Sequence, residues 1–446
     1  MLVLATFHSL LDTYSMHIYF SGIGGAGIGP LAQIAHQAGY QVSGSDKQAS
    51  AYIDYLQQHG ISNIHIGQSY QAIEAVNEQS PIDWLVYSSA VSIENDHHPE
   101  LEFCKQQGIK LSKRDEFLNA FLHQQHLDMI GVAGTHGKTT TTAMTTWLFK
   151  QSNQPVSHLL PAKTSFTEMG EYNPDSQWFV YEADEFDRNF LTFEPKITVV
   201  TGVSWDHHEL FPTRDDYQAA FREFISQSQH TFIWQEDADY LSLTASDNVS
   251  IMDSADEHID QIKLLGKYNR LDAWLAIQAV HRATKQPIAE LISLANQFPG
   301  LSRRMEMLAP DLYTDYAHTP EKIRGAMSVA LEMAGESGQQ LVVVYEPLTN
   351  RRQHFMLNDY RDCFDGATKV YWLPSYLARE DPNQPILTPA ELIAHLDNSS
   401  LAEPMERNDR LKSVIQQHLD KGDMVVGMAG GGGDSLDDWL RHNFVS

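Results

Sequence analysis

The sequence predicts an α/β protein that is built from three domains. Short apolar runs alternate with helix-like segments along the chain, which is typical of parallel sheets covered by helices. Three of the apolar runs lead into glycine-rich turns, where α/β proteins commonly bind anions. The 446 residues are enough for about two to four domains of ordinary size. We place the domains at residues 16–124, 125–299 and 300–446.

The first domain opens with a strand, a helix and two further strands. These elements are predicted at Met16–Ser21, Pro30–Ala38, Gln41–Gly44 and Trp84–Ser88. The polar stretch His123–His126 is the predicted linker to the second domain. Residues 1–15 contain no Lys or Arg and therefore lack the charged start of a signal peptide. We expect them to be a frayed extension or a misassigned start.

The second and third domains repeat this alternation. In the second, strands are predicted at Met129–Ala133, Trp178–Tyr181, Ile197–Val203 and Thr231–Trp234, with a helix at Lys138–Lys150 and a buried helix after Asn269. In the third, the predicted strands are Leu341–Tyr345, Val370–Leu373 and Met424–Met428, and the predicted helices are Ile323–Met333 and Leu392–Leu396.

The composition narrows the class of protein. The chain carries 31 Lys and Arg against 58 Asp and Glu, a formal net charge of −27, so its surface as a whole repels polyanions. We therefore expect no nucleic-acid partner. Its two cysteines exclude a disulfide framework and fit a reducing compartment. No apolar run reaches the about 18 residues that a membrane span needs, so we expect a cytoplasmic protein.

The first glycine-rich turn is Gly22-Ile-Gly24-Gly25-Ala26-Gly27, between a predicted strand and a predicted helix. Asp46 follows 19 residues after Gly27, where a ribose-binding acid lies in dinucleotide folds. On its own, this pattern indicates an NAD site. The alternative is a tight turn that needs glycine only for packing.

The second turn, Gly131–Thr140, is the strongest single signal. It resembles a P-loop, although the strict pattern requires glycine where this chain has Val132. In such a loop the backbone N–H groups hold phosphate oxygens, Lys138 reaches the terminal phosphates and Thr139 binds Mg²⁺. The third turn, Gly430–Gly433, is either an anion site or a flexible turn, and we favour the flexible turn.

Carboxylates and histidines follow two strands behind the P-loop. Glu182-Ala-Asp184-Glu185 comes after one apolar run and Asp206-His207-His208 after another. Strand ends are where nucleotide enzymes place metal ligands. Glu182 and His207 therefore form a predicted second Mg²⁺ site, if their strands are neighbours. Taken singly, each residue is more simply explained as part of an acidic loop or as a half-exposed histidine.

Taken together, these motifs resemble the Mur ligases, ATP-dependent enzymes that add amino acids to the UDP-N-acetylmuramic acid precursor of peptidoglycan. The resemblance runs from Met16 onward and is greatest to the branch that adds L-alanine. Its further motifs are Ser43–Asp46, Tyr87–Ala90, Gly266–Asn269, Arg303-Arg304 and Asp315–Pro320.

The resemblance implies a fold class and a ligand for each domain. The α/β domains would be an N-terminal Rossmann-like UDP-binding domain, a central P-loop ATPase-like domain and a C-terminal Rossmann-like domain. In this family the first turn binds UDP, so the resemblance replaces the NAD interpretation. The cofactors would be ATP and Mg²⁺. The partners would be UDP-N-acetylmuramic acid and an amino acid or short peptide. The protein would be a monomer or a homodimer.

The resemblance also assigns roles to individual residues. The catalytic residues would be Lys138, Glu182, His207 and Arg304. The nucleotide would be bound by Gly134, Thr135, Gly137, Lys138, Thr139, Thr140, Asn269, Arg304 and Asp315. The other substrates would be bound by Gly24, Gly25, Ala26, Asp46, Ser88, Ser89, His318 and Arg352. The metal ligands would be Thr139, Glu182 and His207.

Several departures from the family pattern keep the amino-acid substrate open. The second asparagine of the nucleotide motif is Asp272 here. The family's Gln-Pro-His segment reads Glu346-Pro347-Leu348, and Arg352 keeps only the second of the two arginines that follow it. Arg222 stands where several members carry a carbamylated lysine. The L-alanine branch and the peptide-recycling branch also lack this lysine, so Arg222 supports the resemblance to that branch.

Three alternatives follow. The first is a recycling ligase that attaches a tripeptide to UDP-N-acetylmuramic acid. The second is a non-catalytic UDP-sugar-binding regulator, which the departures from the family pattern motivate. The third is an NAD-dependent oxidoreductase, which would leave the P-loop and the carboxylates without a role.

Overall fold

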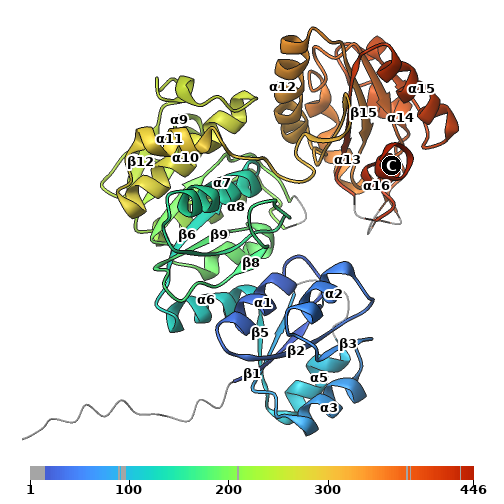
Figure 1. Cartoon of the computed structure of the whole chain (residues 1–446). Coiled ribbons are helices and arrows are strands. Elements are labelled where there is room, and N and C mark those ends of the chain that lie inside the picture. Colours follow the sequence, from blue (N-terminus) through green and yellow to red (C-terminus); the bar gives the residue numbers. More distant parts are fainter. Residues whose placement is uncertain are drawn as a thin grey trace, which may run out of the picture.

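The computed structural model describes residues 16–88, 91, 97–207, 210–377, 380–381, 383–431 and 433–445. Figure 1 shows three α/β units, each built around its own sheet and following one another along the chain. The α/β fold class predicted from the sequence is thereby confirmed. Within the described residues, no helix combines the length and the apolar character needed to cross a membrane.

The first unit has a parallel sheet of order β3-β2-β1-β4-β5, in which β1 is central. Its strands are β1 His17–Ser21, β2 Gln41–Asp46, β3 Ile64–Ile66, β4 Trp84–Tyr87 and β5 Lys110–Lys113. Its helices are α1 Gly29–Gln37, α2 Ala51–Gln58, α3 Tyr70–Gln79, α5 Pro99–Gln107 and α6 Arg114–Gln124. Since α6 runs to Gln124, the prediction of a linker over His123–His126 was wrong in its first half. Leu118, Phe121 and Leu122 of α6 bury an apolar stripe that continues the helix through the polar sequence.

The second unit has a sheet of order β12-β11-β10-β6-β9-β7-β8, parallel except for β8. Its strands are β6 Asp128–Ala133, β7 Val156–Leu159, β8 Gly170–Glu171, β9 Trp178–Glu182, β10 Ile197–Val200, β11 Thr231–Trp234 and β12 Val249–Met252. Its helices are α7 Lys138–Gln151, α8 Arg214–Gln227, α9 Gln235–Tyr240, α10 Lys267–Thr284 and α11 Ile288–Ala295, with 3-10 turns at Phe186–Thr192 and Ile259–Gln261. The carboxyl ends of β9, β6 and β10 are therefore neighbours at one edge of the sheet.

The third unit has a sheet of order β13-β14-β18-β15-β16-β17, parallel except for the β13–β14 hairpin. Its strands are β13 Glu306–Ala309, β14 Leu312–Asp315, β15 Leu341–Glu346, β16 Lys369–Trp372, β17 Ala402–Pro404 and β18 Met424–Ala429. Its helices are α12 Pro320–Ser337, α13 Asn350–Met356, α14 Pro389–Ile393, α15 Asp409–Asp420 and α16 Leu436–Phe444, with 3-10 turns at Leu357–Tyr360 and Ser399–Leu401.

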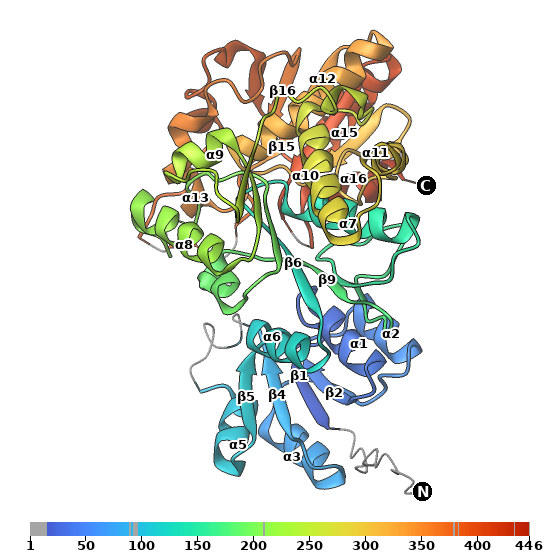
Figure 2. The same cartoon turned by 90° about the vertical axis from the view of Figure 1, so that its left-hand side faces the viewer.

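The three units contact one another through defined elements. One apolar cluster runs from the first unit into the second, and the Phe121 ring of α6 lies 5.6 Å from the Tyr172 ring after β8. The third unit meets the second where α12 packs against α10, as Figure 2 shows. There Arg270 pairs with Glu332 at 2.8 Å, and Glu332 also accepts from the Gly266 N–H at 2.9 Å. These contacts set the junction at which the functional residues lie.

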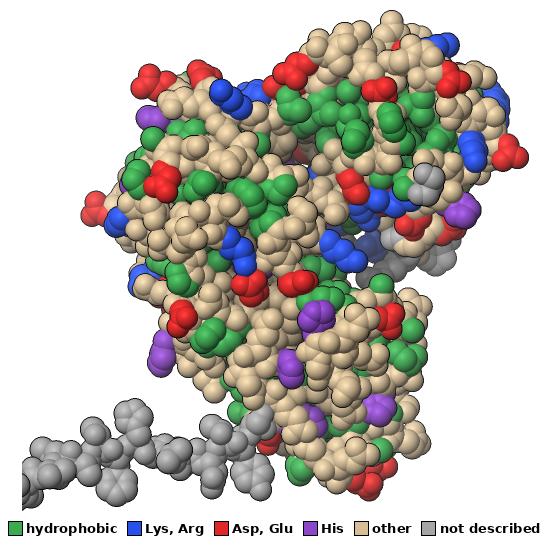
Figure 3. All heavy atoms as spheres, viewed as in Figure 1, with side chains coloured by type: hydrophobic (Ala, Val, Ile, Leu, Met, Phe, Trp, Pro, Cys, Tyr) green, Lys and Arg blue, Asp and Glu red, His purple; other side chains and the backbone are tan. Residues whose placement is uncertain are grey.

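The surface charge is not evenly distributed. Figure 3 shows acidic side chains scattered over the outer face, whereas Lys and Arg side chains gather where the third unit faces the other two. The net charge of −27 therefore describes the exterior and does not describe the junction.

Candidate active site

The second glycine-rich turn joins β6 to α7 in a shape that requires glycine. Gly134 has φ +142° and Gly137 has φ +77°. A Cβ atom at Gly134 would come within 2.5 Å of the Thr201 hydroxyl, and one at Gly137 within 2.7 Å of an Asp272 oxygen. No side chain caps α7, so the first N–H groups of the helix remain available to an anion.

Lys138, the first residue of α7, points at carboxylates in this structure. Its ammonium lies 2.5 Å from Glu185 and 3.5 Å from Asp184. Burial alone would lower the pKa of Lys138, but Glu185, Asp184 and Glu182 together hold that pKa above its usual value. Lys138 is therefore a buried permanent cation next to the glycine turn.

Polar groups from the neighbouring strands converge on Lys138. Thr139 donates a hydrogen bond of 2.8 Å to Glu182 at the end of β9. Burial raises the pKa of the Glu182 carboxyl, which Lys138 partly offsets. Burial also acts on Asp184, but the charges of Lys138 and His207 prevail and lower its pKa to about 2. Asp184 is therefore ionised at neutral pH.

His207 reaches this group from the loop after β10. Its Nε2 atom lies 3.8 Å from Glu185, and Asp184, Glu185 and His207 hold ligand atoms within 4.8 Å of one another. The residue has φ +53°, a conformation that is uncommon without glycine and that clusters at functional sites. The structure thus groups His207 with Asp184 and Glu185, and it leaves Glu182 bonded to Thr139. The pairing of Glu182 with His207 stays a prediction.

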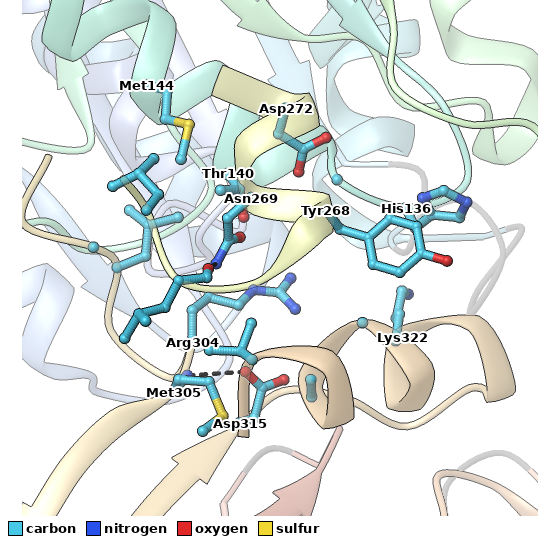
Figure 4. Close-up of a pocket in the computed structure, with 18 of the residues that line it drawn as sticks. His136, Thr140, Met144, Tyr268, Asn269, Asp272, Arg304, Met305, Asp315 and Lys322 are labelled. Atoms are coloured by element: carbon cyan, nitrogen blue, oxygen red, sulfur yellow. Dashed lines mark hydrogen bonds between the residues drawn. The ribbon is translucent and has the colours of Figure 1, made fainter. Parts of the chain in front are cut away.

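A cavity of about 660 Å³ opens beside the glycine turn, between the second and third units (Figure 4). Five predicted nucleotide-binding residues line it: Gly137, Thr140, Asn269, Arg304 and Asp315. Figure 4 shows the apolar Met144 at one end of the cavity and His136 and Lys322 at the other end, with Arg304 between them; Leu264 and Phe298 also line the cavity. A heterocyclic base fits the apolar end and phosphates fit the basic end.

Some predicted nucleotide residues are engaged within the protein. The Thr135 N–H donates to Gly202 O at 2.7 Å and its hydroxyl donates to Ser204 O at 2.7 Å, so Thr135 holds the loop after β10. Asn269 donates from its side chain to Leu265 O at 2.8 Å. Asp315 accepts from the Met305 N–H at 2.9 Å and so fixes the turn before β13 that presents Arg304.

The two adjacent arginines have different surroundings. Arg303 donates to the backbone of Ala429 and Gly431 and lies 3.3 Å from Asp437, whereas Arg304 lines the cavity. Figure 4 shows Arg304 reaching into the cavity above Asp315. Arg303 therefore holds the third unit together, whereas Arg304, which lies 5.5 Å from the Tyr316 ring, faces the cavity.

Asp272, in α10, is a buried carboxyl on the cavity wall. Burial raises its pKa to about 8, which outweighs the opposing effects of Thr141 and Arg304. An aspartate in the unfolded chain titrates near about pH 4. Between these two values the folded protein holds one more proton than the unfolded chain, so its stability falls as the pH rises from about 4 to about 8.

We expect Asp272→Asn, a neutral isostere, to remove this dependence. Without nucleotide, its melting temperature should exceed that of the wild type at pH 8, and the difference should shrink toward pH 4. Melting curves over that pH range measure the effect, with the exposed Asp365→Asn as the control. A constant difference at all pH values would contradict the argument.

The first glycine turn lies at the carboxyl ends of β1 and β2. Gly24 donates its N–H to Asp46 at 2.8 Å, and a Cβ atom at Gly22 would lie 3.9 Å from the Ser88 hydroxyl. The structure therefore brings the turn, Asp46 and Ser88 together, with Gly25 and Ala26 exposed at its tip. The predicted residue Ser89 and the neighbouring Ala90 lie outside the described residues, as does His208.

Sequence reasoning missed Arg114, at the start of α6. A Cβ atom at Gly27 would lie 2.5 Å from its guanidinium, and its charge lowers the pKa of Asp184 after burial and nearer groups. Arg114 thus stands between the first turn and the carboxylates. No motif marks it, because this position arises only from the packing of the first unit on the second.

The third unit contributes His318, Lys322 and Arg352. His318 is 3% exposed and bonds through Nδ1 to Tyr316 O at 2.7 Å, and Arg352 bonds to His207 Nδ1 at 3.3 Å. The Arg352 bond places the third unit against the predicted metal ligand. Lys322 was also missed by sequence reasoning, although it follows Pro320 in a motif that the sequence shows.

Two protein-family models match the chain. The model described as "Mur ligase family, catalytic domain" covers residues 17–126, and the one described as "Mur ligase middle domain" covers residues 132–255. Among curated proteins, the UDP-N-acetylmuramate–L-alanine ligase of Renibacterium salmoninarum is 29% identical, over 93% of each chain. The ligase of the same name from Xanthobacter autotrophicus is also 29% identical, over 95% of each chain.

Solved structures show the same fold. The UDP-N-acetylmuramate–alanine ligase of Thermotoga maritima has a TM-score of 0.68 at 22% identity and covers 94% of this chain and 96% of its own. A murein peptide ligase of Psychrobacter arcticus has a TM-score of 0.57 at 20% identity and covers 97% of this chain and all of its own. Both likenesses extend over all three units.

Proposed function

This chain belongs to the Mur ligase family, whose members are ATP-dependent ligases that form C–N bonds, and we propose that it joins L-alanine to UDP-N-acetylmuramic acid. The observation that carries the proposal is the convergence of Lys138, the carboxylates and the cavity at one junction. It is supported by the name that its full-length relatives share. The reaction belongs to peptidoglycan precursor synthesis and, we propose, takes place in the cytoplasm.

The site is suited to phosphoryl transfer. The glycine turn offers backbone N–H groups, Lys138 offers a buried cation, and the adjoining cavity offers an apolar end for the base. When a triphosphate binds, Lys138 exchanges Glu185 for the terminal phosphates. Before the nucleotide binds, the ion pair of 2.5 Å with Glu185 keeps the Lys138 side chain in the site.

The donors present fit a hard divalent cation. Glu182, Asp184, His207 and Thr139 offer oxygen and imidazole ligands at one strand edge, and Asp184 is ionised at neutral pH. Glu185 is 1% exposed and also accepts from the Tyr217 hydroxyl at 3.2 Å, so we favour Glu182 and Asp184 as the carboxylate ligands. When bound, Mg²⁺ would neutralise the charge that develops between the nucleotide and the acceptor carboxylate.

An amine cannot displace hydroxide from a carboxylate, because hydroxide is a poor leaving group. ATP therefore converts the carboxylate into an acyl phosphate, from which phosphate can leave. A carboxylate oxygen of the sugar attacks the γ-phosphorus, the bond to the β–γ bridging oxygen breaks, and ADP leaves. The amine then attacks the acyl carbon, and inorganic phosphate departs with that carboxylate oxygen. Lys138 and Arg304 stabilise the negative charge in both steps from opposite sides of the junction.

The sugar nucleotide would bind at the first glycine turn. Its diphosphate meets the turn around Gly25 and the start of α1, and Arg114 supplies a cation beside Gly27. Arg114 also faces Asp184, so it lies on the path from this turn to the site of phosphoryl transfer. The acceptor carboxylate would therefore extend from the first unit toward Lys138.

The identity of the amine is the open part of the proposal. Leu348 and Thr349 replace the family's histidine and first arginine, while Arg352 is retained and contacts His207. A murein peptide ligase shares the fold, so a tripeptide is the second candidate for the substrate that supplies the amine. The three units, one for each substrate, also predict a closure step during turnover.

A phosphate-release assay tests the proposal. The enzyme is given ATP, Mg²⁺ and UDP-N-acetylmuramic acid with L-alanine, L-serine, glycine or the tripeptide, and the products are weighed by mass spectrometry. We expect release that depends on L-alanine, with one product per phosphate. If phosphate is released only with the tripeptide, the amine substrate is the tripeptide and not L-alanine. If the protein binds the UDP-sugar but releases no phosphate with any amine, the regulatory alternative is favoured.

A further inference from the structure

Lys322 lies on α12 and has no role in the proposed reaction described above. Its side chain lines the cavity on the side of the third unit, and Figure 4 shows it rising from α12 toward His136 of the glycine turn. Within the part of the chain that the structure describes, its ammonium has no hydrogen bond and no ion pair, since no carboxylate lies within 4.0 Å of it. Lys322 therefore lacks a salt-bridge partner among the described residues.

The charges around Lys322 make this state unfavourable without a ligand. Burial and the charges of Lys138, Arg304 and Arg352 together lower its pKa to about 8, against the opposing effect of Asp206. Lys322 in turn helps to hold the pKa of His136 down at about 4, after burial. Arg304 lines the cavity together with Lys322, and the carboxylates that also line it, Asp272, Asp315 and Glu321, form no ion pair with Lys322 within the described residues.

A lysine that has no ion pair, lines the cavity and faces His136 of the glycine turn points to an anionic ligand. We propose that Lys322 is a second phosphate-binding lysine, which the third unit supplies to the terminal phosphate of the nucleotide bound by the glycine turn of the second unit. The assignment rests on the proposed nucleotide site. Lys138 holds the phosphate from one unit and Lys322 from the other, so the nucleotide joins the two units directly.

Two neighbours in the cavity support this role over a structural one. Arg324, two residues further along α12, pairs with Asp362 at 2.6 Å and therefore already has a partner. Arg304 projects from the turn before β13, which Asp315 fixes, and it comes from the third unit, as Lys322 does. Lys322 is thus the α12 cation that is left for the nucleotide.

The test is the affinity for two nucleotides that differ only in the terminal phosphate. Calorimetric titrations of AMP-PNP and ADP, with Mg²⁺, compare the wild type with Lys322→Met, and the exposed Lys412→Met serves as the control. A lost charge-assisted hydrogen bond predicts that Lys322→Met weakens AMP-PNP about 10- to 100-fold more than it weakens ADP. Lys322→Arg should recover part of the difference, since it keeps the charge.

The outcomes separate this assignment from the proposed function. If Lys322→Met weakens both nucleotides equally or neither, Lys322 does not contact the terminal phosphate, while nucleotide binding by the wild type still stands. If the wild type binds neither nucleotide, the proposed function fails and the assignment fails with it. Because nucleotide binding is measured without the UDP-sugar and without the amine, the identity of the amine substrate does not affect the result.

Discussion

Lys138→Ala should lower the rate of ADP formation by at least about 10³-fold, while the protein remains folded. Lys138 is the buried cation at the start of α7, and its ammonium lies 2.5 Å from Glu185. Removing it leaves the transferred phosphate without its main counter-charge. Steady-state kinetics with saturating ATP, Mg²⁺, UDP-N-acetylmuramic acid and L-alanine measure the loss.

The matched control is Lys150→Ala, on the same helix. Lys150 pairs with Glu171 at 2.7 Å, at the far end of α7 from the glycine turn, and so it should keep near-normal activity. Binding of the UDP-sugar to Lys138→Ala verifies that the first unit is intact. ADP formation by Lys138→Ala within tenfold of the wild type would refute its role.

Glu182→Gln should raise the Mg²⁺ concentration for half-maximal rate at least about 10-fold and lower the maximal rate about 100-fold. The substitution keeps the size of the side chain and its hydrogen bond with Thr139, and it removes the charge. Since Lys138 and Tyr217 already engage Glu185, Glu185→Gln should change the Mg²⁺ dependence less. Rates measured across a Mg²⁺ titration give both values.

The control for this pair is Glu168→Gln, which lies away from the strand edge in the loop before β8. If Glu185→Gln shifts the Mg²⁺ dependence more than Glu182→Gln does, the ion is held by the cluster of Asp184, Glu185 and His207 instead. That result would correct the pairing of Glu182 with His207.

The core strands were predictable from the sequence because both faces of a parallel sheet are covered. Strands such as β6, β11 and β18 are therefore continuous apolar runs. The edge strands β3 and β17 were missed because they are three residues long and half-exposed, which leaves no periodic pattern. The β13–β14 hairpin was missed for a related reason, since none of the residues of β13 is fully buried.

The candidate site was predictable where chemistry is contiguous in sequence. Lys138 and Thr139 stand next to one another in a loop motif, and Glu182 ends an apolar run. The placement of His207 beside Glu185 depends on the strand order β10-β6-β9, which the sequence does not reveal. Arg114 and Lys322 gain their positions only when the units pack together, so no local pattern announces them.

The net charge acquires a narrower meaning from the structure. A value of −27 argues against a polyanion on the outer surface. The proposed substrates are anions as well, but they bind at helix N-termini and at the cations gathered where the units meet. The acidic exterior thus repels polyanions, whereas the junction would bind the anionic substrates.

The most direct measurement of the central claim follows the oxygen atoms of the acceptor. UDP-N-acetylmuramic acid labelled with ¹⁸O in both carboxylate oxygens is turned over with ATP, Mg²⁺ and L-alanine, and the inorganic phosphate is analysed by mass spectrometry. An acyl phosphate predicts one ¹⁸O atom in each phosphate released and one in the amide of the product. Phosphate without ¹⁸O, formed by attack of water on ATP, would contradict the account.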